Sequence, residues 1–172
     1  MQMQTSPIET EIDRAKDRFA LYGPAIMADR DFPGLVAQYR EAIQATHRLM
    51  QELQVVALCS RCANTASGSC CAREVETWYD DWLLFINLLL GVPLDTVREA
   101  HDHCLFVGAN GCKLIARHSF CVNFLCPEIL SALTPSDKEK LLAASGAELY
   151  AGWILEQRLR QWLNHNAGRD ED

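Results

Sequence analysis

The stretch CSRCANTASGSCC, residues 59–71, places four cysteines within thirteen positions and separates two long helical patterns. The other cysteines of the chain are Cys104, Cys112, Cys121 and Cys126. All eight therefore lie in one segment, residues 59–126. Three uses of so many thiols compete: disulfide bonds, metal binding and thiol chemistry.

Apolar residues recur at helical spacing on both sides of this segment. Ser6-Pro7 predicts the start of a first helix, and Gly23-Pro24 predicts its end. Further helices are predicted over residues 31–58, 72–90, 95–103 and 134–165, with Gly91 as a C-terminal cap of the third. These elements predict a protein of the all-α class.

The segment CLFVGANGCKLI, residues 104–115, has a different pattern. Two short apolar runs flank Gly108-Ala109-Asn110-Gly111, which predicts a small hairpin or tight loop. A helical turn carrying Cys121 and Cys126 is expected to follow. No internal repeat or low-complexity linker divides the chain, so residues 1–172 are predicted to form one helical domain.

Composition narrows the class of protein. The chain has 172 residues, 49% of them hydrophobic, and needs no disulfide bonds merely to stay folded. Its 16 Lys and Arg against 23 Asp and Glu give a net charge of -7, without the basic clusters that bind nucleic acid. The N-terminal sixteen residues do not resemble a secretory signal, and the apolar run at residues 82–92 is too short to cross a bilayer. We therefore expect a cytoplasmic protein with neither a nucleic-acid nor a membrane partner.

In the reducing cytoplasm, clustered cysteines serve as metal ligands or catalytic thiols more often than as disulfides. Cys59 and Cys62 form a C-x2-C pair, whose spacing lets two sulfurs on a tight turn reach one metal ion. A redox C-x2-C pair usually belongs to an alternation of strands and helices, which this sequence lacks. Metal binding is therefore favoured, and eight thiols supply the ligands of one or two centres.

The order of these residues resembles the cysteine-cluster family described as a zinc- or iron-chelating domain. The motifs that carry the resemblance are Cys59 with Cys62, Cys70-Cys71, Cys104-Leu105-Phe106, Gly111-Cys112, Arg117 with Cys121, and Cys126. The resemblance covers residues 59–126 and implies a cytosolic metal-binding protein, often one that holds an iron–sulfur cluster. Similar cysteine clusters occur in the flagellin lysine methylases.

The predicted metal ligands are all eight cysteines: Cys59, Cys62, Cys70, Cys71, Cys104, Cys112, Cys121 and Cys126. Arg117, His118 and His103 lie near them in the sequence and are predicted to surround the sulfurs. Zinc sites favour two C-x2-C pairs, and only one is present, whereas an iron–sulfur cluster tolerates irregular spacing. The expected cofactor is therefore an iron–sulfur cluster of the 4Fe–4S type, with zinc as the alternative.

The expected function is accessory metal binding or electron transfer. Two alternatives stay open: a cluster-dependent enzyme of the methylase type and a zinc-stabilised interaction module. The chain has no Gly-rich nucleotide-binding loop, which weighs against an enzyme that uses a nucleotide cofactor. Catalytic residues, protein partner and oligomeric state are not defined by the sequence.

Overall fold

The structure, a computed structural model, describes residues 7–63, 69–99 and 101–166. Within those ranges it contains seven α-helices, one 3-10 helix and a sheet of two short strands. The all-α class predicted from the sequence is confirmed. None of the described helices combines the length and apolarity needed to cross a membrane.

In chain order the elements are α1 (Pro7–Ala28), α2 (Phe32–Glu52), α3 (Val55–Ala63), the 3-10 helix η1 (Arg73–Trp78), α4 (Asp81–Leu89), β1 (Val107–Gly108), β2 (Gly111–Cys112), α5 (Ser119–Asn123), α6 (Pro127–Ala132) and α7 (Pro135–Asn166).

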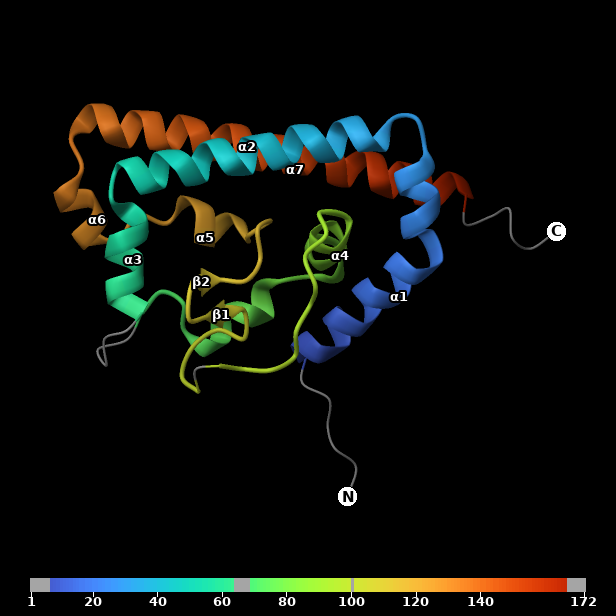
Figure 1. The fold of residues 1–172 in the computed structure, drawn as a ribbon, viewed down its shortest axis with the longest axis horizontal. Helices are drawn as coiled ribbons and strands as arrows, with labels where there is room; N and C mark the ends of the chain where they lie inside the picture. Colours follow the sequence, from blue (N-terminus) through green and yellow to red (C-terminus); the bar gives the residue numbers. More distant parts are fainter. Residues whose placement is uncertain (1–6, 64–68, 100, 167–172) are drawn as a thin grey trace, which may run out of the picture.

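The most extensively packed pair of helices, α2 and α7, runs antiparallel along the top of the view in Figure 1. At one end of this pair α1 descends and packs against α4, and at the other end α3 descends and packs against α6. The hairpin and α5 lie between α1 and α3 in that view (Figure 1). The helices therefore frame the segment that carries the cysteines.

Two hydrophobic clusters fill the described interior. The main cluster draws on α1, α2, α4, the hairpin and α7, and its fully buried members include Ile12, Ile26, Phe85, Phe106 and Leu159. The second cluster is smaller and lies where α3 and α6 meet the ends of α2 and α7. Its buried members are Met50, Val55, Ile129, Leu133 and Leu141. The cysteines lie along both clusters.

The first helix continues through Gly23-Pro24 to Ala28, so the predicted stop is wrong. Proline inside a helix costs about 3 kcal/mol, because it removes a hydrogen bond and crowds the preceding turn. Ile26 lies beyond the proline and is completely buried in the main cluster. Burial of that side chain offsets the local cost, and a local sequence pattern cannot register such a tertiary gain.

The helix predicted over residues 31–58 is divided in two. Its first part, α2, ends at Glu52, and Gln54 adopts a positive φ of 60°. Main-chain and side-chain nitrogens of Gln54 both donate to the carbonyl of Gln51, at 3.0 and 3.2 Å, and hold this turn. The chain changes direction there, so that Val55 enters the second cluster and the C-x2-C pair lies on its own helix.

The helix predicted over residues 72–90 is likewise divided, into η1 and α4. Asp80 begins α4 by accepting a hydrogen bond from Leu83 N at 2.9 Å, and Gly91, with φ of 79°, follows its end as predicted. The prediction of a helix over residues 95–103 is wrong, since none of the described residues in that range is helical. Tertiary hydrogen bonds hold this segment instead, and they outweigh helix propensity.

The last predicted helix is confirmed as α7. Two of its large apolar side chains, Leu142 and Trp153, are 48% and 54% exposed. Ser145 and Glu148 are buried in their place. The Ser145 hydroxyl satisfies its burial by donating to the carbonyl of Leu141 at 2.9 Å. The buried face of α7 is set by its packing against α2 and is not its most apolar face.

Hydrogen bonds of the Asn87 side chain connect α4 to the segment that follows the hairpin. This side chain is completely buried. Its Nδ2 donates to the carbonyls of Leu83 and Ala116, at 3.0 and 2.8 Å, and its Oδ1 accepts from the amides of Ile115 and Ala116, at 3.2 and 3.1 Å. The side-chain amide of Asn87 thus uses both of its donor hydrogens and its acceptor oxygen. These bonds fix the main chain at Ala116, which leads to Cys121 and Cys126.

We expect Asn87→Ala to lower the free energy of unfolding by about 3 kcal/mol, because it leaves buried main-chain groups without partners. Chemical denaturation followed by circular dichroism measures the change. Asn164→Ala, at an exposed position of α7, is the matched control and should change the value by less than about 0.5 kcal/mol. Equal effects of the two variants would contradict the anchoring role of Asn87.

Candidate metal centre

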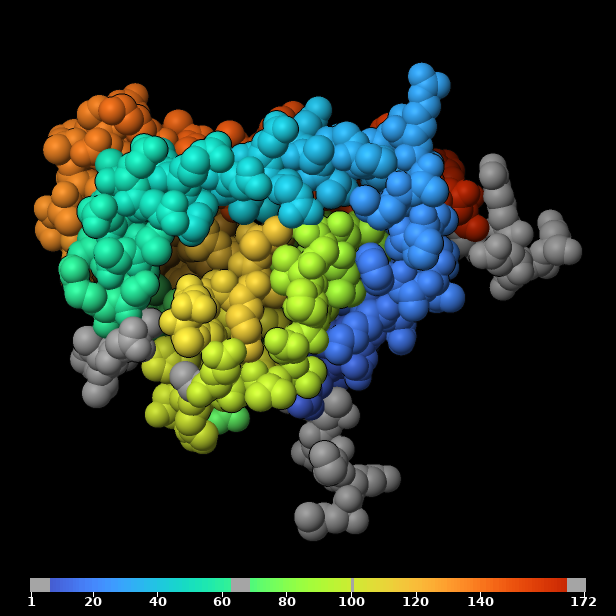
Figure 2. Space-filling view, in the orientation of Figure 1, coloured from blue at the N-terminus to red at the C-terminus, as the bar shows by residue number. Residues whose placement is uncertain are grey.

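The structure distributes the eight cysteines over six places. Cys59 and Cys62 lie on α3, Cys70 and Cys71 precede η1, Cys104 precedes β1, Cys112 ends β2, Cys121 lies on α5 and Cys126 caps α6. None of the eight cysteines forms a disulfide bond within the described residues. In the space-filling view, the yellow hairpin segment and the teal α3 lie on the same face of the molecule (Figure 2).

Main-chain contacts join Cys71 to Cys104. The amide of Cys104 donates to the carbonyl of Cys71 at 2.8 Å, and Ala72 and His103 form an isolated antiparallel bridge. Cys104 is buried in the main hydrophobic cluster, and Cys71 packs against the same cluster. Two segments that are more than thirty residues apart in the chain are therefore held side by side at these two cysteines.

The predicted hairpin is confirmed, and it carries Cys112 back toward Cys104. Val107 pairs with Cys112, and Gly108 pairs with Gly111. The amide of Val107 also donates to the carbonyl of Cys104 at 2.9 Å. Gly111 has a φ of 101°, a conformation that only glycine adopts readily. The tight turn thus sets the positions of the two cysteines relative to each other.

Tyr79 holds α5, and with it Cys121, over the hairpin. Its buried hydroxyl donates to Cys121 Sγ at 3.8 Å and accepts from the amide of His118 at 3.2 Å. Its ring meets the ring of Phe106, with centroids 5.0 Å apart. Sequence reasoning missed this role of Tyr79, although a buried tyrosine generally requires a hydrogen-bond partner.

A second group of contacts joins Cys126 to the helix that carries the C-x2-C pair. Cys126 packs against the second hydrophobic cluster together with Leu58, which lies on α3 beside Cys59. Arg61 and Glu128 form an exposed ion pair of 3.9 Å between α3 and α6. The close packing of these two short helices brings the last cysteine of the chain to the first ones.

The thiols around α3 influence one another electrostatically. Burial raises the pKa of Cys59 to about 11, with repulsion from Cys70 and Cys126 adding to the rise. Burial and the same two neighbours also raise the pKa of Cys62. Each of these thiols therefore lies in the electrostatic field of the others, and ionisation of one opposes ionisation of the next.

The thiols around the hairpin form a corresponding group. Burial raises the pKa of Cys104 to about 12, and repulsion from Cys112 and Cys121 adds to the rise. The electrostatic neighbours of Cys71 are Cys121, Cys112 and Cys104. The neighbouring thiol of Cys70 lowers the pKa of Cys71, and Cys70 is also an electrostatic neighbour of Cys121, so the two groups of thiols are continuous at this adjacent pair.

Arg117 is the cation that lies near both groups. Burial raises the pKa of Cys59, Cys112 and Cys121, and the positive charge of Arg117 opposes the rise at all three. Its guanidinium is half-buried and lies 3.8 Å from the sulfur of Met50. The position of Arg117 is consistent with the prediction that it surrounds the sulfurs.

The two histidines predicted near the cysteines have structural contacts. His118 caps α5, with its Nδ1 accepting from the amide of Phe120 at 3.2 Å, and its ring packs against Trp78 and Tyr79. Burial lowers the pKa of His118. The carbonyl of His103 accepts a hydrogen bond from Arg98. These contacts position the segments that carry the cysteines.

The sequence analysis missed an ion pair between the buried Glu76 and the half-buried Arg98. The carboxylate of Glu76 accepts hydrogen bonds from the Arg98 guanidinium and from the amide of Leu105, next to Cys104. Arg98 in turn donates to His103, on the other side of Cys104. The hydrogen bond to Glu76 raises the pKa of Arg98. The pair thus fixes the main chain on both sides of Cys104.

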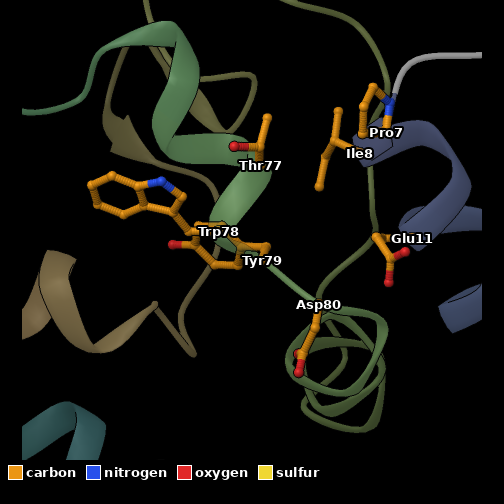
Figure 3. A pocket seen from close by; sticks show the side chains of 7 residues that line it. All are labelled: Pro7, Ile8, Glu11, Thr77, Trp78, Tyr79 and Asp80. Atoms are coloured by element: carbon orange, nitrogen blue, oxygen red, sulfur yellow. The ribbon is translucent and has the colours of Figure 1, made fainter.

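One cavity has no cysteine in its lining. It has a volume of about 330 Å³ and opens between the start of α1 and η1 (Figure 3). Its carboxylates are engaged, because Glu11 accepts from the amide of Asp81 at 3.0 Å and Asp80 caps α4. Trp78, on its wall, packs against Phe120 with ring centroids 4.9 Å apart. Trp78 thus links the wall of this cavity to α5.

Within residues 7–63, 69–99 and 101–166, no group of three or more His, Cys, Asp or Glu side chains already lies close enough together to hold a metal ion. The sulfurs are thus gathered in one region without converging on a point. Comparison with protein-family models, curated proteins and solved structures found no match to this chain. The resemblance to the cysteine-cluster family therefore remains a prediction, and function has to be argued from the site.

Glu76→Ala should lower the free energy of unfolding by about 2 kcal/mol, because it leaves the buried amide of Leu105 without its acceptor and the half-buried guanidinium of Arg98 without its carboxylate partner. Denaturant-induced unfolding measures the loss. Glu74→Ala is the matched control: it removes the same side chain two residues away, at an exposed position of η1. If both variants unfold at the same denaturant concentration, Glu76 does not hold the segment around Cys104.

Proposed function

We propose that this protein binds metal through its cysteine thiolates, with iron–sulfur clusters as the favoured occupant and zinc as the alternative. The observation that carries the proposal is the gathering of all eight cysteines, from six separate places in the chain, into one region between α3, the hairpin and α5. Eight thiols that merely filled a hydrophobic core would have no reason to gather beside one another.

The chemistry of the donor set fits these metals. Thiolate sulfur is a soft ligand that selects zinc and iron–sulfur clusters over magnesium, calcium or manganese. The nearest histidine, His118, uses its Nδ1 in capping α5. With sulfur as the dominant donor, a closed centre takes four cysteines.

The electrostatics of the region support the same proposal. Burial and mutual repulsion raise the pKa of thiols such as Cys59 and Cys104, so the thiolate forms are destabilised next to one another. A bound cation compensates that repulsion and draws the sulfurs together, which couples metal binding to the local fold. Such coupling accounts for thiols that are gathered but do not yet converge.

The two occupants would give the protein different roles. Iron–sulfur clusters would give the protein a role in electron transfer. Zinc has no redox chemistry and would stabilise the packing of the hairpin and α3 against the other helices. The irregular spacing of the cysteines and the single C-x2-C pair favour the clusters. A cytoplasmic location, where thiols stay reduced, forms part of the proposal.

Anaerobically purified protein should contain stoichiometric iron and acid-labile sulfide, with a broad absorption band near ~400 nm typical of thiolate-ligated iron–sulfur clusters. Elemental analysis and the absorption spectrum are the measurements. Colourless protein with stoichiometric zinc would select the alternative occupant. Protein that holds neither metal after anaerobic preparation and reconstitution would refute metal binding.

Cys62→Ser should lower the metal content and the melting temperature together, because metal bound only to the folded state adds its binding free energy to stability. The expected fall is about 5–10 °C, since each kcal/mol corresponds to about 2–4 °C in a domain of this size. Ala57→Ser, at an exposed position of the same helix, should leave both quantities unchanged. Full metal content in Cys62→Ser would exclude Cys62 as a ligand.

A further inference from the structure

We infer that this protein forms a symmetric dimer in which the α7 helices of two copies pack against each other in antiparallel orientation. The surface used is an apolar stripe on the side of α7 that faces away from α2, α4 and α5. The stripe comprises Leu142, Ala143, Gly146, Ala147, Tyr150 and Trp153, all of which are exposed. The inference is independent of the proposed metal binding, because the stripe contains no cysteine.

The polarity of α7 is reversed over residues 141–155. Glu148 carries the single charge in that range, and its side chain is buried, as is that of Ser145. The exposed positions of the same range are the six residues of the stripe. Their spacing of three and four residues places them on one face of the helix. Because a helix at a protein surface normally bears its charges outward, a contiguous apolar patch there marks an interaction surface.

Three large side chains anchor the stripe. Tyr150 and Trp153 are 64% and 54% exposed, and their rings stack with centroids 6.0 Å apart. Leu142 lies at the other end of the stripe and is 48% exposed. Tyrosine and tryptophan carry much of the binding energy of protein interfaces, because their rings bury a large area at little cost in conformational entropy. The stacked pair is therefore already arranged for contact with a partner.

Gly146 lies in the middle of α7, where glycine weakens a helix relative to alanine. A Cβ atom at this position would meet no other part of the protein within 4 Å, so packing inside the chain does not require glycine there. Ala143 and Ala147 are its neighbours on the stripe. The distance between two packed helices depends on the side chains at the contact, and small ones allow a close approach. The small size of Gly146 thus serves a helix that packs from outside.

The order of large and small residues along the stripe matches a second copy of α7. Trp153 and Ala143 are centred on position 148, and so are Tyr150 and Gly146. A two-fold axis at that level, with the helices antiparallel, places each ring of one copy over a small residue of the other. Parallel copies would set each large residue against itself. The antiparallel pair is therefore the arrangement in which this surface is complementary to itself.

The ends of the stripe are compatible with the same arrangement. Glu139 and Lys140 are exposed before it, and Arg158 is exposed after it. In the antiparallel pair, each Arg158 meets the end of the partner helix that carries Glu139, whereas parallel copies would set like charges against each other at every position. An anionic membrane surface suits the stripe poorly, because the chain has a net charge of -7.

The size of the stripe predicts a reversible dimer. Its length is about three helical turns. Its exposed aromatic, leucine and alanine side chains put the surface removed from solvent at roughly 1,000 Å² over both copies, which is the lower limit for a specific interface. We therefore expect a dimer of micromolar affinity that dissociates on dilution.

Sedimentation equilibrium of the full-length chain, over a wide range of concentration and with a reducing agent to prevent intermolecular disulfides, tests the inference. The average mass should rise from 19.4 kDa towards twice that value as the concentration increases. A mass that stays at 19.4 kDa throughout overturns the dimer, and the stripe then serves another partner or none.

Gly146→Gln tests the surface. The added side chain is exposed in a single copy but overpacks the proposed contact, so the dissociation constant should rise by about tenfold or more. Gly34→Gln is the matched control, because Gly34 is also an exposed helical glycine with open space around it, and it lies on α2. It should leave self-association unchanged. Equal dissociation constants for the two variants would overturn the use of this stripe.

An exchange of large and small residues tests the orientation. Gly146→Tyr should weaken the dimer, because Tyr150 of the partner then meets another ring. Adding Tyr150→Ala should restore the affinity, since the exchanged residues are complementary again. Absence of recovery overturns the antiparallel pairing. Circular dichroism verifies that each variant is folded, and Trp153→Ser, at an exposed position, replaces any Gly146 variant that is not. Trp153→Ser should weaken the dimer by about tenfold or more, and an unchanged affinity would overturn the inference.

Discussion

The packing of α2 against α7 is the constraint on which the rest of this structure depends. This antiparallel pair carries α1 at one end and α3 at the other, and the cysteine segment occupies the region between them. The segment has only short elements: two strands of two residues each and the five-residue helix α5. Elements of that length are not stable alone in water, so the helical frame has to hold them.

A few buried polar side chains connect the frame to the segment. Asn87 satisfies the main chain around Ala116, and Glu76 holds the main chain around Cys104 together with Arg98. Tyr79 extends the same principle to a sulfur atom, at Cys121. Because an unpaired polar group is costly in the interior, each of these bonds specifies a position as well as contributing to stability.

The neighbouring thiols oppose one another's ionisation, and positively charged side chains offset this repulsion only in part. Burial and mutual repulsion oppose their ionisation, and Arg117 is the cation that offsets this at Cys59, Cys112 and Cys121. One guanidinium cannot balance the charge of several thiolates, particularly in a chain with a net charge of -7. Under the function proposed above, a metal ion or an iron–sulfur cluster would supply the missing positive charge.

The sequence by itself determined the all-α class, the hairpin at Gly108–Gly111, the long C-terminal helix and the eight cysteines as the residues of interest. These features follow from local rules: apolar periodicity, turn-forming glycines and the spacing of chemically distinctive side chains. Only the tertiary structure decided that α1 continues through Pro24, that Gln54 separates α3 from α2, and that Glu76 is buried while Glu74 is exposed. Each of these outcomes depends on what lies across the core, because burial and long-range hydrogen bonds outweigh local propensity by more than any sequence window can register.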